Sequence, residues 1–253
     1  MAALDEILAD LDGLLEPAGF DDYCPNGLQV IGRAEINTLV TGVSAHLELF
    51  DRALAAGADL ILTHHGLFWN GDDRRVTGPL HRRLRLLLAN DLGLAAYHLP
   101  LDAHPECGNN ALIAAGLGGV DRRPFGLHRG REIGCRARFP GDGLAAAELV
   151  ARVERLTGRP PLAFTAGPDA VRTVGIVSGA GCSHLGEAIA AGLDAFITGE
   201  PAERAMAEAR ESRIHFLAAG HYATETFGVR ALGDRLADRF GIRHIFVDVP
   251  NPI

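Results

Sequence analysis

The chain has 253 residues, 47% of them apolar, and a formal net charge of −8, a composition typical of a globular protein with room for two modest domains. The acidic balance argues against general attraction to nucleic acids or anionic membranes, because both are polyanions, so any anion site must be local. All 24 cationic side chains are arginines, which excludes covalent lysine chemistry and lysine-based phosphate binding.

The sequence also indicates the compartment. The first residues, MAALDEILADLDGLL, are acidic and lack the basic segment of a secretory signal. No apolar run reaches the roughly 18 residues of a membrane span. The four cysteines are scattered without a C-x-x-C pair, as is usual for reduced thiols. We therefore expect a cytoplasmic protein with no membrane association.

Seven short apolar runs predict buried strands. They are TLVTGVS (38–44), LILTHH (60–65), LAAYHLP (94–100), TVGIVSG (173–179), AFITGE (195–200), IHFLAAGH (214–221) and HIFVDVP (244–250). Stretches with helical spacing, such as HLELFDRALAAG and PAERAMAEARES, lie between them. Alternating strands and helices predict an α/β fold with mainly parallel sheets.

The chain also repeats itself. ALAAGADLILT (53–63) and AIAAGLDAFIT (188–198) are identical at six of eleven positions, and a similar strand precedes each. Joints between a helix, a glycine and a strand can resemble one another in any α/β protein, which is the simpler explanation. A Gly- and Pro-rich stretch, 121–168, separates the two copies. We predict two similar α/β/α domains, residues 1–125 and 126–253, with an approximate boundary.

The first strand end that draws attention carries His64 and His65, directly before Gly66. Neighbouring side chains of a strand point to opposite faces. Both imidazoles therefore reach one place only if the strand ends there and the chain turns, as Gly66 permits. The carboxyl ends of strands are where ligands bind in open α/β sheets.

Two later strand ends carry similar residues. Asp102 follows the strand that ends near Tyr97, and the flanking prolines of HLPLDAHP predict that it lies on a loop. His221 and Glu225 come after Gly220, where the pattern becomes helical, and their spacing of four places them on one helix face. Each feature also has a simpler explanation. A capped strand end would account for His64 and His65, a helix cap for Asp102, and an exposed helix pair for His221 and Glu225.

Together, three strand ends supply three imidazoles and two carboxylates. Five such ligands suit two metal ions about 3.5 to 4 Å apart. Nitrogen and oxygen donors favour zinc, iron or manganese over calcium or copper(I). We predict a dinuclear site with His64, His65, Asp102, His221 and Glu225 as ligands. Hydrolysis by activated water is the chemistry that such a site supports.

Several motifs resemble one known family, and the resemblance runs from about residue 5 to the C-terminus. They are DYCPNGLQVIG (22–32), THHGLFW (63–69), HLPLDAHPECGNN (98–110), DAFITGE (194–200), AAGHYATE (218–225) and VDVPNP (247–252). They are similar to motifs of the Nif-three-like dinuclear-metal proteins, in particular the bacterial YbgI type, whose members are often named type 2 GTP cyclohydrolase homologues. Many relatives have proline after the two histidines, where this chain has Gly66.

The resemblance implies two α/β domains, a toroidal homohexamer and a dinuclear metal centre with the five ligands already selected. It leaves the substrate open. The expected function is a metal-dependent hydrolase of a small nucleotide or phosphorylated metabolite, similar to type 2 GTP cyclohydrolase, with His98 or Glu200 moving protons. The alternative is a ring protein without catalytic activity that stores or delivers metal or docks partners. DNA binding is not expected, because no helix-turn-helix or zinc-finger pattern is present.

Three further features have two explanations each. Asn26-Gly27 predicts a tight turn into a strand and can also place Gln29 near the site. Glu200 occupies the position of His65 in the repeat, where it either accepts a hydrogen bond from a ligating imidazole or caps the helix predicted over 201–211. The arginines between residues 74 and 85 are either a solvated surface or phosphate contacts.

Overall fold

The computed structural model describes residues 1–253, which form two compact units. The first unit consists of residues 1–101 and 228–249, and the second of residues 102–227 and 250–253.

This division differs from the boundary expected near residue 125. Residues 102–125 belong to the second unit because they include α5 (Asn109–Gly116) and most of β7 (Val120–His128), which pairs with a strand of that unit. The chain returns to the first unit near its end, where β15 (Arg243–Phe246) pairs in parallel with β4 (Thr38–Ser44). No change in composition marks either crossing.

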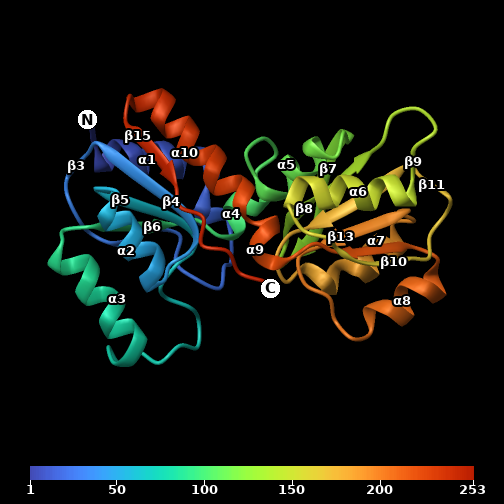
Figure 1. The fold of residues 1–253 in the computed structure, drawn as a ribbon, viewed down its shortest axis with the longest axis horizontal. Coiled ribbons are helices and arrows are strands. Elements are labelled where there is room, and N and C mark those ends of the chain that lie inside the picture. Colours follow the sequence, from blue (N-terminus) through green and yellow to red (C-terminus); the bar gives the residue numbers. More distant parts are fainter. The chain divides into compact units, whose positions relative to one another are not determined.

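The first unit is a five-stranded sheet with helices on both faces (Figure 1). The strand order is β15-β4-β5-β6-β2, in which only the pair of β6 and β2 is antiparallel. The other strands of this sheet are β2 (Gly27–Val30), β5 (Leu60–His65) and β6 (Gly93–Ala96), and β1 (Ala2–Ala3) pairs with β3 (Glu35–Ile36) in a separate short ribbon. α1 (Leu4–Leu15) and α10 (Thr226–Phe240) lie on one face, and α2 (Leu47–Ala55) and α3 (Gly78–Ala89) on the other.

The second unit is a six-stranded sheet in the order β10-β14-β13-β12-β8-β7. β14, β13 and β12 form a parallel centre, and the outer pairs are antiparallel. The strands not yet defined are β8 (Arg131–Arg138), β10 (Leu162–Thr165), β12 (Thr173–Val177), β13 (Ala195–Thr198), β14 (His215–Ala218) and the small pair β9 (Leu144–Ala145) and β11 (Ala170–Val171). The helices are α5, α6 (Ala146–Thr157), α7 (Leu185–Ala190), α8 (Ala205–Ser212) and α9 (His221–Thr224). α5 and α6 lie on one face, and α7 and α8 on the other (Figure 1).

Both sheets are buried because their central strands are continuous apolar runs, as is usual for parallel strands covered on two faces. Val40, Ile61 and Leu94 come from three neighbouring strands of the first sheet and are fully buried. Ile176 and Ile197 are their counterparts in the second. The predicted α/β fold is therefore confirmed. No helix has the length and apolar character needed to cross a membrane.

The structure supports the internal duplication by a shared hydrogen-bonding device. In the first unit, the Asp59 carboxylate accepts hydrogen bonds from the backbone N–H groups of Asn37 (2.9 Å) and Thr38 (3.0 Å), at the start of β4. In the second unit, the Asp194 carboxylate accepts hydrogen bonds from the backbone N–H groups of Arg172 (2.8 Å) and Thr173 (2.9 Å). Asp59 directly precedes β5 and fixes the start of β4, and Asp194 directly precedes β13 and fixes the start of β12. The two joints therefore share a hydrogen-bonding arrangement as well as a sequence pattern.

Candidate functional site

Three imidazoles gather at the carboxyl end of the first sheet. His64 and His65 end β5, and His98 follows β6, its parallel neighbour. A nitrogen from each ring lies within 4.8 Å of a nitrogen of both others. His64 is fully buried and His98 is nearly so. The carboxyl ends of parallel strands meet at one edge, so this clustering follows from the strand order.

The ring atoms that these histidines offer to a ligand are set by their hydrogen bonds. The Nδ1 atom of His64 donates to the backbone oxygen of Tyr97 (3.1 Å), and that of His98 donates to the Asp22 carboxylate (2.7 Å). A carbonyl and a carboxylate only accept hydrogen bonds, so Nδ1 carries the hydrogen in both rings and Nε2 carries the lone pair. Metal-binding imidazoles are usually oriented in this way.

Asp22 is the residue of this group that sequence analysis missed. Its carboxylate also accepts hydrogen bonds from Asn26 Nδ2 (2.8 Å) and the backbone N–H of Leu99 (3.0 Å), while Asn26 Oδ1 accepts one from the backbone N–H of His98 (2.7 Å). Burial alone would raise the pKa of Asp22, but His98 and these donors lower it to about 2. The predicted Asn26-Gly27 turn therefore helps to orient His98. The DYCPNG motif was the available signal.

His65 is held from two sides. Its Nδ1 atom lies 3.0 Å from the Ser44 hydroxyl at the end of β4. Its ring centroid lies 5.6 Å from that of Trp69, which in turn is 5.2 Å from the His98 ring. The indole thus packs against two imidazoles and limits their motion.

Gly66 serves a different purpose from the one predicted. Its backbone does not adopt a positive φ, but a Cβ atom there would lie 2.1 Å from Nε2 of Gln29. The Gln29 amide donates to the backbone oxygen of Pro25 (2.7 Å) and accepts from the N–H of Leu67 (2.7 Å). A side chain at residue 66 would displace the Gln29 amide from these hydrogen bonds, by which Gln29 ties the chain after the histidines to β2.

Asp102 lies in a short helix, α4 (Leu99–Ala103), and not on the loop that was predicted. Pro100 was expected to prevent a helix, but proline is tolerated in the first turn, where its missing N–H has no partner within the helix. In the second unit the Asp102 carboxylate accepts hydrogen bonds from Asn109 Nδ2 (2.8 Å) and the Ser178 hydroxyl (3.0 Å). Asp102 is buried, so its carboxylate is fixed.

His221 begins α9 and Glu225 directly follows it, and His221 Nε2 lies 3.1 Å from a Glu225 carboxylate oxygen. The Nδ1 atom of His221 donates a hydrogen bond to Glu200. Burial would lower the pKa of His221, but the two carboxylates outweigh it and raise the pKa to about 9. Glu200 is not the predicted helix cap, since Arg204 occupies the N-cap position of α8.

Gly179, just after β12, allows these groups to approach. It has φ +58°, and a Cβ atom there would lie 2.1 Å from a Glu225 carboxylate oxygen and 3.1 Å from Nε2 of His221. Its N–H donates to the Thr224 hydroxyl (3.1 Å), and its carbonyl accepts from the N–H of Glu200 (2.9 Å). The second unit thus arranges an imidazole and two carboxylates around one strand end.

The chemistry of these donors fits a divalent transition metal. Imidazole nitrogen and carboxylate oxygen are ligands that zinc, iron and manganese share. Cys24 also lies close to Asp22 and His98, but burial, together with the charge of Asp22, raises the pKa of its thiol to about 12. A neutral thiol is a poor metal ligand. Each unit therefore carries side chains that can bind metal through nitrogen and oxygen.

The arginines of residues 74–85 are exposed or half-buried along α3 and the loop before it. Arg75 forms an ion pair with Asp73 at 2.6 Å. Its guanidinium therefore already has a carboxylate partner, as expected for a solvated surface.

Known proteins resemble the chain over its whole length. The family model described as Duf34/NIF3 (NGG1p interacting factor 3) matches residues 2–252. A Pseudomonas aeruginosa protein named GTP cyclohydrolase 1 type 2 homolog is 44% identical over 250 residues, which cover 99% of this chain and 98% of the relative. An Escherichia coli K12 protein of the same name is 43% identical and covers 94% of both chains.

Solved structures give the same result. The protein ybgI, whose function is described as unknown, is 40% identical with a TM-score of 0.94, and TTHA1606 from Thermus thermophilus is 38% identical with a TM-score of 0.90. Both match 100% of each chain. Reduced HcgD from Methanocaldococcus jannaschii, at 23% identity and a TM-score of 0.84, shares the fold. The fold, the motifs and these matches together show that the chain belongs to the Duf34/NIF3 family.

Proposed function

We propose that the protein is a hydrolase that depends on two divalent metal ions and acts on a small nucleotide or phosphorylated metabolite. The proposed ligands are His64, His65, Asp102, His221 and Glu225. The observation that carries the proposal is the common orientation of the imidazoles. In His64 and His98, Nδ1 donates to an oxygen that only accepts hydrogen bonds, so Nε2 carries the lone pair that can bind a metal; in His221, Nδ1 is held by Glu200 in the same way, and Nε2 faces the Glu225 carboxylate.

The carboxylates support the same proposal. Asp102 and Glu225 are buried, and a buried carboxylate is costly unless cations or hydrogen-bond donors satisfy it. Asn109 and Ser178 both bind one oxygen of Asp102, Oδ1. They fix the plane of the carboxylate.

A pair of divalent ions supplies activated water and neutralises developing negative charge in hydrolysis. The chain's own residues supply orientation and proton transfer. Asp22 holds His98 by Nδ1, so His98 can accept a proton at Nε2 from the attacking water and return it to the leaving group. Glu200 acts as a positioning residue, because its hydrogen bond to Nδ1 fixes the ring of His221.

The substrate class follows from the relatives, which are named GTP cyclohydrolase 1 type 2 homolog. Opening of a purine imidazole ring and cleavage of a phosphoester are both hydrolytic reactions, and the same five ligands serve either. We also propose a homohexameric ring, because the resemblance to the family implies that assembly and the family model matches residues 2–252. Light scattering of the purified protein tests that assembly.

Metal content and turnover test the function. Elemental analysis of protein purified without chelator should give about two ions per chain, as expected for a two-metal site. His65→Ala should lose metal and abolish hydrolysis of any nucleotide or phosphoester that the wild type converts. His81→Ala is the matched control, because His81 is an exposed histidine of α3, and it should retain both. Absence of metal after loading with zinc, iron and manganese would contradict the proposal.

Turnover separates the hydrolase from the alternative ring protein that stores or delivers metal. Protein with full metal content should convert at least one member of a panel of nucleotides and phosphoesters. Metal that exchanges readily, together with no conversion of the panel, favours the binding protein.

A further inference from the structure

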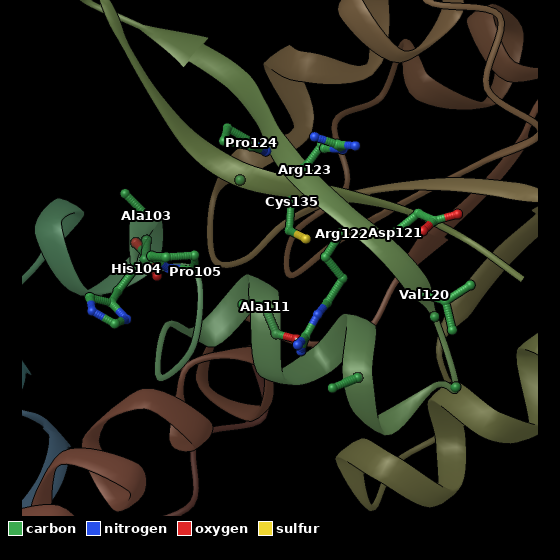
Figure 2. Close-up of a pocket in the computed structure, with 15 residues that line it drawn as sticks. Ala103, His104, Pro105, Ala111, Val120, Asp121, Arg122, Arg123, Pro124 and Cys135 are labelled. Carbon is green, nitrogen blue, oxygen red and sulfur yellow. The ribbon is translucent and has the colours of Figure 1, made fainter.

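A pocket of about 620 Å³ lies in the second unit, between α5 and the hairpin formed by β7 and β8 (Figure 2). The segment after α4 closes one side, and Cys135 of β8 contributes to the wall. Pockets of about 300 to 1,000 Å³ are typical of small-molecule sites. None of the proposed metal ligands except Asp102 lines it.

Small residues make the pocket hollow. Ala111 and Ala115 face it from α5, and Gly118 and Gly119 continue the same wall. A Cβ atom at Gly119 would lie 2.8 Å from the backbone oxygen of Ala114 and 2.9 Å from the Cβ atom of Ala137. The tight turn between α5 and β7 therefore needs glycine, and the residues around it provide little side-chain volume.

A β-bulge directs an arginine into this space. Val120 pairs with Arg138, but Arg123 pairs with Arg136, so β7 contains one extra residue at this point. Bulges of this kind change the direction of a side chain and are common beside functional sites. Arg122, at the bulge, extends against α5 and donates a hydrogen bond to the backbone oxygen of Ala111 at 3.2 Å, whereas Arg123 extends the other way (Figure 2).

Arg122 has capacity for a charged ligand. No carboxylate pairs with its guanidinium, since the adjacent Asp121 lies 3.9 Å from Arg138 and the Asp102 carboxylate is bonded to Asn109 and Ser178. One of its five N–H groups is used by Ala111. Burial raises the pKa of the Cys135 thiol, so that side chain adds no negative charge. Asp102 and Asp121 also line the pocket, so its cationic character is confined to the Arg122 guanidinium.

We propose that this pocket binds a small organic anion, a metabolite that carries a carboxylate or phosphate group and is no larger than a mononucleotide. Arg122 binds the anionic group, because a planar guanidinium matches both groups with two parallel hydrogen bonds. The remainder of the ligand packs against Ala111, Ala115 and Pro124. An organic body is required, since most of the wall away from the guanidinium is apolar.

Isothermal titration of the full chain tests the proposal with four probes at millimolar concentration. AMP and benzoate each combine an anionic group with a planar ring, adenosine lacks the anion, and inorganic phosphate lacks the ring. At least one of AMP and benzoate should bind with one site per chain and about tenfold more tightly than adenosine and phosphate, the ratio expected for one charge-assisted contact. Which of the two binds distinguishes a phosphate from a carboxylate ligand.

Three variants test whether the probe binds in this pocket. Arg122→Gln should weaken the bound probe by about tenfold or more, whereas Arg136→Gln, an exposed arginine of β8 outside the pocket, should not change it. Ala115→Leu leaves Arg122 intact but fills the pocket, so it should also weaken binding. Thermal unfolding of each variant confirms that it is folded.

Two results would overturn the inference. One is that none of the four probes binds. The other is that His65→Ala abolishes binding while Arg122→Gln leaves it unchanged, which would assign the probe to the proposed metal site. Binding that depends on Arg122 and persists in His65→Ala supports the pocket even if the proposed hydrolase function fails.

Discussion

The two copies of the internal repeat share a set of hydrogen bonds at the start of a strand and carry different side chains at the end of one. In each, an aspartate after a glycine accepts two backbone hydrogen bonds from the start of the neighbouring strand. The strand that follows ends with His64-His65 in the first copy, whereas in the second copy it ends at Thr198 and Gly199-Glu200 come directly after it. The residues that fix the scaffold are thus the same in both copies, whereas those at the strand end differ.

The difference extends to the neighbouring strand. Ser44, the last residue of β4, and Gly179, which lies just beyond β12, occupy equivalent positions when the two copies are aligned. Ser44 presents a hydroxyl to the Nδ1 atom of His65. Gly179 has no side chain, and Glu225 and His221 occupy the space where one would lie. The first copy therefore carries its imidazoles on the sheet, and the second leaves a gap that is filled by His221, the first residue of α9, and Glu225, which follows that helix.

The largest effect that tests this comparison is expected at Gly179. Gly179→Ala puts a Cβ atom into a left-handed backbone conformation and 2.1 Å from a buried Glu225 oxygen. We expect a loss of about 3 kcal/mol in the free energy of unfolding, from backbone strain and displacement of the carboxylate. Urea denaturation measures it. Ser44→Gly is the reciprocal change and should cost about 1 kcal/mol. Equal losses would contradict the assigned roles.

The two aspartates should behave alike. Asp59→Ala and Asp194→Ala each leave two backbone N–H groups at a strand start without their acceptor, which we expect to cost about 2 kcal/mol in each case. Arg33 pairs with Asp59, and the Thr173 hydroxyl donates to Asp194, so each also loses one side-chain partner. Urea denaturation of both variants compares them. A large loss for one and none for the other would break the equivalence of the copies.

The orientation of His98 predicts a pH dependence. The folded-state pKa of Asp22 is about 2, below its ordinary value of 3.8. A depressed carboxyl pKa adds stability that is complete above about pH 4 and is lost as the pH falls towards 2. The contribution should be about 2 kcal/mol. In Asp22→Asn the unfolding free energy should fall less steeply between pH 4 and pH 2. An unchanged slope would mean that Asp22 does not hold the imidazole as described.

Local patterns predicted the scaffold well, because buried parallel strands are continuous apolar runs. TLVTGVS and LILTHH correspond residue for residue to β4 and β5. Boundaries were less certain where polar residues follow a strand. The run 94–100 included Pro100, but β6 ends at Ala96 and α4 begins at Leu99, because proline in a first turn starts a helix as readily as it breaks one.

The partners of the candidate ligands could not be read from the sequence. Asp22 meets His98 and Ser178 meets Asp102, and in each pair 76 residues separate the two along the chain. No local spacing marks such contacts. The direction of Arg122 was equally hidden, since it depends on an extra residue in β7 relative to β8. Sequence patterns selected the donors by type, and long-range packing decided what orients them.

The smallest effect is expected at Ser44, and it sharpens the comparison of imidazole supports. Ser44→Ala removes the hydroxyl beside Nδ1 of His65 and keeps the Cβ atom, so the unfolding free energy should change by less than about 1 kcal/mol.

Glu200→Gln replaces the charged acceptor of His221 with a neutral one. If both histidines bind metal as proposed, Glu200→Gln should weaken metal binding by about 10- to 100-fold and Ser44→Ala by less, because a carboxylate makes an imidazole a stronger donor than a hydroxyl does. Competition with a chelator measures both affinities. A larger loss for Ser44→Ala would show that the hydroxyl, and not the carboxylate, is the more important support.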